Sequence, residues 1–355
     1  MSELQEIQVQ DIQPSNEDKV RGLKSVCMRL GIMMIIVFLM RGAATILSDF
    51  IAPLLENMDA VAVYAIDALV SMIFLYAIPM TAAYLLLWKP RNTSLKTVYK
   101  KPVYFNHALG MFPAIYAVGI SVNLLTMLVS LLFVNSPDIN KSFNTVNELT
   151  PPNTAAALIL FFQLTVIAPV FEELWFRGFV MESLRPYGNG FAIFISGILF
   201  GITHGNLQQI FYATALGICL GYIAQTTKSI VTTTVMHAIF NSISGFILLF
   251  YSTPQVMHYM ETMGAEGTDD PVVIALLVFL FFIVITLIVG LFMAIAKFRK
   301  IKKYRVEKVW EYSSARRWGI FLSRATVIIM LVLAIDTVTF RFITEFLYEL
   351  VHGAA

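Results

Sequence analysis

Charged residues are scarce in this chain. Asp, Glu, Lys and Arg make up 14% of its 355 residues, whereas 58% are hydrophobic. A water-soluble domain of this length needs more charge to cover its surface, so the composition excludes an ordinary soluble protein. Apolar blocks of about 17–30 residues recur along the chain, long enough to cross a hydrocarbon core of about 30 Å. We therefore expect an all-α fold, a polytopic transmembrane helix bundle with about eight or nine spans.

Cysteine is also scarce. Cys27 and Cys219 lie far apart in apolar blocks, which excludes a disulfide framework and a cysteine-based metal site. The zinc-protease signature HExxH, low-complexity tracts and repeats of roughly 20–50 residues are absent. The polar start, MSELQEIQVQDIQPSNED, has no hydrophobic signal-peptide region, and we expect residues 1–25 to form a cytosolic polar tail.

The apolar blocks and the basic loops between them predict a topology. Basic residues follow the second and eighth blocks, and the second of these loops includes KFRKIKKYRVEK (297–308), which we expect to contact anionic lipid headgroups. The positive-inside rule therefore places the N-terminus in the cytosol. The C-terminus lies outside if the polar ninth block spans the membrane, and inside if that block lies along the interface. The candidate spans are 26–48, 60–88, 107–134, 154–176, 189–204, 207–226, 229–251, 272–297 and 319–350.

One stretch differs from the rest of the membrane region. Residues 151–251 concentrate ionisable side chains within apolar helices, between N-terminal membrane helices at 26–150 and C-terminal membrane helices with the basic cytosolic loop at 252–355. The same stretch contains two GxxxG pairs, Gly197/Gly201 and Gly217/Gly221, which are typical of close helix packing.

Three polar motifs stand out in residues 151–251. The first is Glu172-Glu173-Leu-Trp-Phe-Arg177, where Glu173 and Arg177 are four residues apart and share a helix face. Glu172 is rotated about 100° from Glu173 and can face another neighbour. Adjacent carboxylates in a membrane helix are costly unless they have partners or a function. Pro169, just before them, predicts a kink of the kind tolerated beside cavities.

The second and third motifs each contain a histidine in an apolar helix. His204 ends Phe-Gly-Ile-Thr-His, and His237 precedes Asn241 by four residues, so these two side chains point the same way. A single buried histidine is more often a satisfied core residue than a catalyst. Two histidines, an Asn and Glu172 on separate spans favour a site.

These residues suit peptide hydrolysis. Such a reaction needs a base that activates water and donors that stabilise the oxyanion. Glu172 with His204 could hold the water, and His237 with Asn241 could hold the oxyanion. A catalytic zinc ion held by Glu172, His204 and His237 would use the same residues, and the sequence does not choose between the two.

The order EExxxR, FxxxH, HxxxN on successive helices resembles the CPBP family, the CAAX-processing and bacteriocin-processing intramembrane proteases also called Abi proteins. The resemblance covers roughly residues 150–250. It implies a catalytic cavity within the membrane that opens toward the cytosol. It also implies cleavage near the C-terminus of prenylated proteins in eukaryotic members, and of peptides or membrane substrates in bacterial ones.

The resemblance implies roles for six residues. Glu172 activates water with His204, Glu173 and Arg177 complete the first motif and position Glu172, and His237 and Asn241 stabilise the oxyanion. Family members are described as metalloproteases and as glutamate-type proteases, so a divalent metal such as zinc stays possible. Asn206 and Gln209 are weaker candidates for substrate contact.

We therefore expect an intramembrane endopeptidase acting on a peptide or membrane-anchored protein, in contact with lipid and without a nucleic-acid partner. Short loops and the lack of organelle signals favour the bacterial plasma membrane. A non-catalytic immunity or peptide-binding protein is the main alternative. A proton-coupled transporter is a weaker one, because no inverted repeat is visible.

Three further polar residues lie within spans. We expect Arg29 and Arg41 to snorkel toward the two interfaces, and Asp67 to pair with a neighbouring helix.

Overall fold

The computed structural model describes residues 15–92, 94–131, 151–262, 264, 269–298 and 313–335. Every regular element within these ranges is a helix, which confirms the all-α class. The expectations for residues 1–14, for most of the basic run and for the chain beyond residue 335 fall outside the described residues.

Seven helical segments of the described chain are long and apolar enough to cross a membrane, so the chain is an integral membrane protein. An eighth candidate is a bent pair, Ser314–Leu322 and Ala325–Ile335, whose halves differ in direction by 74°. The fifth expected span is instead a helix of 14 residues, Asn189–Ile202. That is shorter than the roughly 20 residues a crossing needs, and it packs inside the bundle. The seven spans are Asn16–Leu55, Ala60–Arg91, Phe105–Ser130, Thr154–Tyr187, Gln208–Thr227, Ile230–Tyr251 and Pro271–Ala296.

Several spans are assembled from shorter helical segments. The first half of the chain contains α1 (Asn16–Leu55), α2 (Ala60–Ser71), η1 (Met72–Ala77), α3 (Ile78–Ala83), η2 (Tyr84–Trp88), η3 (Lys89–Arg91), η4 (Leu95–Thr97), α4 (Phe105–Leu109) and α5 (Phe112–Ser130). The fourth span contains α7 (Thr154–Phe162), η7 (Gln163–Ile167), α8 (Ala168–Glu173), η8 (Leu174–Met181), α9 (Glu182–Leu184) and η9 (Arg185–Tyr187). The rest are α10 (Asn189–Ile202), α11 (Leu207–Thr227), α12 (Ile230–Tyr251), α13 (Pro254–Glu261), α14 (Pro271–Phe298) and α15 (Ser314–Leu322).

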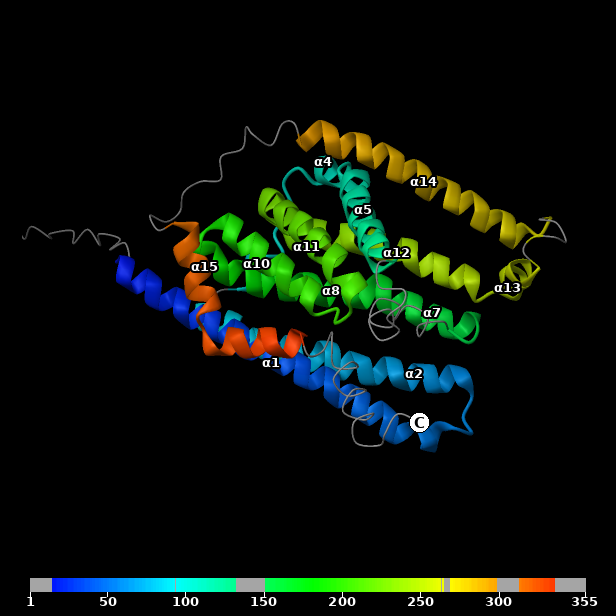
Figure 1. The fold of residues 1–355 in the computed structure, drawn as a ribbon, viewed down its shortest axis with the longest axis horizontal. Coiled ribbons are helices and arrows are strands. Elements are labelled where there is room, and N and C mark those ends of the chain that lie inside the picture. The colour runs from blue at the N-terminus through cyan, green and yellow to red at the C-terminus, as the bar shows by residue number, and fades with distance from the viewer. Residues whose placement is uncertain are drawn as a thin grey trace, which may run out of the picture.

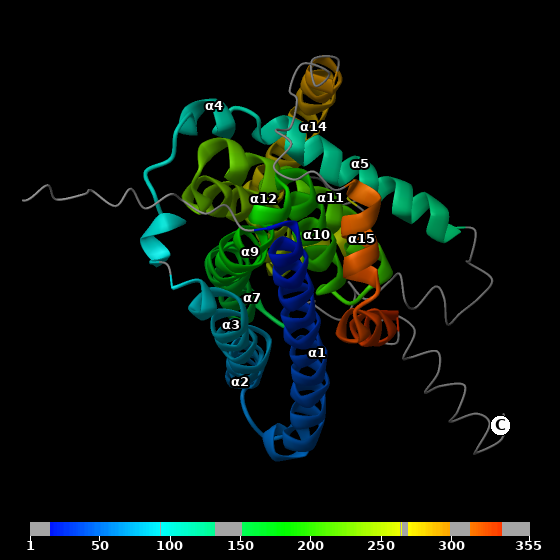
Figure 2. The same ribbon diagram turned by 90° about the vertical axis from the view of Figure 1, so that its left-hand side faces the viewer.

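The helices that carry the polar motifs form the middle of the bundle. α10, α11 and α12 lie together at the centre in two perpendicular views (Figures 1 and 2), and α8 packs against α12 (Figure 1). The hairpin of α1 and α2 covers one side of them, and α5 with α14 covers the other. The polar motifs are therefore enclosed by helices on both sides.

Proline shapes two of the spans. The wide π turns η1 and η7 each end just before a helix with proline in its first turn, at Pro79 and Pro169. Proline has no N–H, and its ring clashes with a carbonyl one turn earlier, so the preceding turn widens. The kink expected near Pro169 is thus realised as a π turn.

Close packing of α10 on α11 depends on the GxxxG glycines. A Cβ on Gly197 would lie 2.8 Å from the backbone nitrogen of Ile218, and one on Gly217 would lie 2.9 Å from Cα of Gly197. A Cβ on Gly201 would lie 2.5 Å from the backbone oxygen of Ile210. The helix-packing interpretation of these glycines is therefore confirmed.

We expect Gly201→Ala to destabilise the protein by about 1–3 kcal/mol, because its new methyl group meets backbone atoms of α11 that cannot move aside alone. Gly190→Ala on the same helix is the matched control, since no atom lies within 4 Å of its added Cβ. Thermal unfolding of the purified protein measures both. Equal unfolding temperatures for the two variants would show that α10 and α11 tolerate separation.

Candidate functional site

A buried ion pair forms the base of the site. Glu173 is the last residue of α8 and Arg177 follows in η8, so both project from one face of the fourth span. Arg177 Nη1 donates to Glu173 Oε1 at 2.9 Å, and both side chains are 0% exposed. The pair expected from the four-residue spacing is therefore present. Its burial makes each charge dependent on the other.

Arg177 also connects the fourth span to its neighbours. Its Nη2 donates to the carbonyl of Gly217 on α11 at 2.9 Å. The guanidinium lies over the ring of Phe200, 4.6 Å from the ring centre, a distance typical of a cation–π contact. Ser196 adds a second link from α10, because its hydroxyl donates to the carbonyl of Phe176 at 2.8 Å. These contacts fix η8 between α10 and α11.

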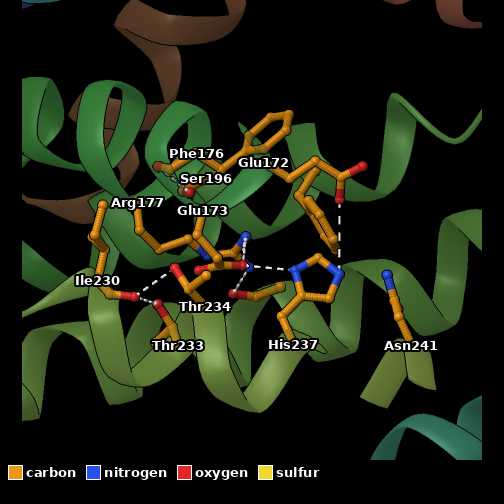
Figure 3. A network of polar contacts seen from close by, with 12 residues as sticks. Glu172, Glu173, Phe176, Arg177, Ser196, Ile230, Thr233, Thr234, His237 and Asn241 are labelled. Carbon is orange, nitrogen blue, oxygen red and sulfur yellow. Dashed lines mark hydrogen bonds and ion pairs between the residues drawn. The ribbon is translucent and has the colours of Figure 1, made fainter. Parts of the chain in front are cut away.

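His237 lies against both carboxylates of the first motif (Figure 3). Its Nδ1 is 3.0 Å from Glu173 Oε1, and its Nε2 is 3.8 Å from Glu172 Oε2. An ionised carboxylate only accepts hydrogen bonds, so Nδ1 carries the proton. In the neutral ring Nε2 then carries a lone pair directed toward Glu172. Glu173 thus fixes the tautomer and orientation of His237.

Glu172 faces away from the ion pair. Its side chain is 17% exposed, compared with 3% for His237. The hydroxyl of Tyr76, in η1 of the second span, donates to Glu172 Oε1 at 3.3 Å, and the Tyr76 ring packs against Phe171. The rotation between adjacent glutamates therefore separates a buried, paired carboxylate from one that is partly accessible.

His204 is held in a different way. Its Nδ1 lies 2.9 Å from the carbonyl of Phe200, which can only accept, so this ring also carries its proton on Nδ1. The Phe200 ring contacts both histidines, with centre-to-centre distances of 5.0 Å to His204 and 5.6 Å to His237. Both histidines therefore contact the same aromatic ring. The contact of Glu172 is with His237.

Arg41 of α1 holds the backbone around His204. It donates through Nη1 to the carbonyl of Thr203 and through Nη2 to that of His204, the latter at 3.0 Å. The expectation that Arg41 snorkels to the outer interface is therefore wrong. Thr203 and His204 directly follow the last residue of α10, so a guanidinium from the first span binds two carbonyls of the turn that ends this helix, where a cation is favourable.

Asn241 fills a gap left by proline. Its Nδ2 donates to the carbonyl of Leu164 in η7 at 2.9 Å. In a π turn that carbonyl would accept from the N–H five residues later, but that residue is Pro169, which has none. Asn241 supplies the missing hydrogen. It lies one turn beyond His237 on α12, and its second amide hydrogen is not used by this bond (Figure 3).

The side chains expected to bind a metal ion do not form a group in the described residues. Among the residues described by the structure, no three side chains of His, Cys, Asp or Glu form a group that could hold a metal ion. Glu172 and His237 face each other, but His204 does not complete a trio with them. The three ligands expected for a zinc ion are therefore not brought together in the described part of the chain.

Asn206 and Asp67 have structural contacts. Asn206 caps α11 by accepting a hydrogen bond from the backbone nitrogen of Gln209 at 2.8 Å. Asp67 accepts from Ser48 on α1 at 3.3 Å, as expected for a pair between neighbouring helices. Tyr76 was not predicted to belong to the site. The one feature of the sequence that could have indicated Tyr76 is the position of a polar aromatic residue within an apolar span.

The comparison with known families covers the same region. Residues 154–243 match the family model of the type II CAAX prenyl endopeptidase Rce1-like proteins. This stretch, called the CPBP core below, is therefore similar to that family. The CPBP core contains all six residues of the three motifs, and the resemblance read from the sequence is confirmed.

A curated relative agrees. This chain is similar to the Bacillus subtilis (strain 168) protein named "Putative membrane peptidase YdiL", with 28% identity over 103 residues. The alignment covers 29% of this chain and 41% of that protein. This chain therefore spans less than half the length of that relative. No solved structure gives a significant match.

Proposed function

We propose that this protein is an intramembrane endopeptidase of the CAAX-protease type, which uses water to hydrolyse a peptide bond of a membrane-associated protein or peptide. The observation that carries the proposal is the pairing of Glu172 with His237. Their facing atoms are 3.8 Å apart, and Glu173 and Arg177 fix the ring from behind. The names of the matched family and of the relative support the same activity.

The first step activates water. Glu172 Oε2 and His237 Nε2 both accept hydrogen bonds and are too far apart to bond directly. A water molecule placed against both can donate one hydrogen to each, which leaves its oxygen directed at a substrate carbonyl. As that oxygen attacks the carbonyl carbon, one of the two acceptors takes the proton as general base.

The proposal differs from the sequence-based expectation in the roles of the two histidines. The sequence pairs Glu172 with His204 at the water, and His237 with Asn241 at the oxyanion. Neutral His237 can only accept through Nε2, because its proton is on Nδ1, so it suits the water rather than the oxyanion. The remaining amide hydrogen of Asn241 suits the oxyanion.

The second step releases the products. The proton taken from water passes to the amide nitrogen as the C–N bond breaks. The water hydroxyl remains on the carbonyl carbon as a new carboxyl group, and the nitrogen leaves as a free amine. If His237 holds that proton, Glu173 stabilises the imidazolium, as a carboxylate does in other His-based hydrolases. His204, with its lone pair on Nε2, is a further acceptor for water or substrate.

The test compares new protein and peptide termini in cells that express wild type or Glu172→Gln at equal membrane levels. We expect wild type to generate termini that decrease at least 100-fold in Glu172→Gln, because the amide cannot act as a base. Glu56→Gln is the control, since it neutralises an exposed carboxylate beyond the end of α1. Mass spectrometry of N- and C-termini is the readout.

Retention of the same termini by Glu172→Gln would refute the catalytic assignment. A phenotype that survives in Glu172→Gln while no termini change would favour a non-catalytic peptide-binding protein instead.

A further inference from the structure

One cavity lies away from the motifs. It has a volume of about 170 Å³ and is lined by α1, by the η2–η3 segment and by the end of the fourth span. Pro186 and Tyr187 line it, and they are separated from Glu172 by roughly 20 Å of helix. This cavity is therefore independent of the candidate hydrolytic site.

Two arginines line the cavity, and no acidic residue does. Arg29 enters from α1 and Arg91 from η3. No hydrogen bond or ion pair joins Arg29 to any other described residue. Arg91 contacts Glu182 through the backbone carbonyl and through a carboxylate oxygen 3.8 Å away, but its buried Nε has no hydrogen-bond partner.

Nearby charges add to the positive potential. Glu182 is shared, because Arg185 also donates to its carboxylate at 2.5 Å. Arg317 of α15 donates to the carbonyl of Tyr187 at 2.8 Å. Two guanidinium groups thus line the cavity and two more contact Glu182 or Tyr187 beside it, while these contacts include a single carboxylate. Partly buried cationic donors in such excess over carboxylates would be stabilised by a bound anion.

The shape of the arginine donors indicates a phosphate. A guanidinium presents paired N–H groups that match phosphate oxygens. The rest of the lining is largely apolar and includes Val26, Leu86 and Pro90. Met28 and Leu85, next to lining residues, are 46% and 49% exposed. An apolar surface beside a cationic cavity suits a molecule with both a phosphate and acyl chains.

The position of the cavity along the bundle also favours a lipid. Arg91 and Tyr187 are the last residues of the second and fourth spans, so the cavity lies where helices leave the hydrocarbon region. The basic loop that follows the second span predicts the cytosolic side for this end. Anionic phospholipids are available at that surface.

We propose that this cavity, between Arg29 and Arg91, binds the phosphate of an anionic phospholipid headgroup. The lipid anchors α1 to the end of the fourth span, which continues into η8 and the motif residues. This site does not depend on the hydrolytic function proposed above, so either assignment can fail alone.

The test measures lipid retained by the delipidated full-length protein after titration with phosphatidylglycerol, phosphatidylcholine of equal chain length, or inorganic phosphate. Native mass spectrometry counts the bound lipid. We expect phosphatidylglycerol binding to fall at least fivefold in Arg29→Gln. Lys24→Gln is the control, since it removes an exposed positive charge from the same helix outside the cavity lining. Arg29→Lys keeps the positive charge but loses the paired N–H groups, so it should bind an intermediate amount of phosphatidylglycerol.

Equal retention of phosphatidylglycerol by wild type and Arg29→Gln would overturn the proposal. Equal retention of phosphatidylcholine and phosphatidylglycerol would overturn it as well, because the site would then not select an anion. Competition by inorganic phosphate at millimolar concentration, without any preference for phosphatidylglycerol, would reject the lipid and assign the cavity to a soluble phosphate.

Discussion

Replacing Arg177 by methionine is expected to destabilise the folded protein by about 3–5 kcal/mol. Arg177 is fully buried, and its removal leaves the Glu173 carboxylate in the bundle without its cation. It also removes the hydrogen bond to Gly217 and the contact with the Phe200 ring. Thermal and denaturant unfolding of the purified protein would measure the loss. Arg177→Lys should recover only part of it, because an ammonium group lacks the fork that reaches both acceptors.

The matched control is Arg21→Met. Arg21 also pairs with a carboxylate one helical turn away, Asp18, but their side chains are 76% and 51% exposed. Exposed pairs contribute about 0–1 kcal/mol, so this variant should unfold nearly as wild type does. Similar losses in Arg21→Met and Arg177→Met would show that burial of the ion pair does not set its importance.

A double variant separates the structural role of the ion pair from its role in the reaction. Glu173→Leu/Arg177→Met removes both charges, and we expect it to be more stable than Arg177→Met alone. It should still lack hydrolytic activity, because His237 has lost the carboxylate that fixes its tautomer. Recovery of both stability and activity would contradict the role proposed for Glu173.

The fold class and one contact of the site could be predicted from local sequence patterns. Long apolar blocks specify membrane helices because the bilayer sets their length. The Glu173–Arg177 pair follows from a four-residue spacing, which brings side chains together in any helix. Neither prediction requires knowledge of how helices pack. The length of α10 was harder to predict, because apolar composition does not distinguish a short buried helix from a span.

The other contacts depend on packing between helices distant in sequence. Arg41 and His204 are 163 residues apart, and Tyr76 and Glu172 are 96 apart. No spacing rule connects such residues, so an arginine inside a span was interpreted as a snorkelling side chain. The tautomer of His237 could not be predicted from the sequence either, because it depends on which carboxylate contacts its Nδ1.

The expected effect of Arg41→Met is a loss of about 100-fold in kcat with little change in KM. Its guanidinium holds the carbonyls of Thr203 and His204, and without it the backbone around His204 can shift. A displacement of about 1 Å in an active site can cost about 100-fold in rate. Steady-state kinetics on a cleaved peptide, once identified, would separate kcat from KM. Lys24→Met on the same helix removes an exposed charge and should leave both constants unchanged.

Gly205 offers an independent approach to the same contact. It has φ +70, and a Cβ there would lie 2.7 Å from Nη1 of Arg41. Gly205→Ala should therefore displace the arginine and lower kcat, although Arg41 itself is intact. Arg41→Lys keeps a cation near the end of α10 but cannot bind both carbonyls as the guanidinium does, so its kcat should lie between those of wild type and Arg41→Met. If Arg41→Met kept the wild-type kcat while Gly205→Ala lost it, the arginine would have no positioning role, and the constraint would belong to the turn at Gly205.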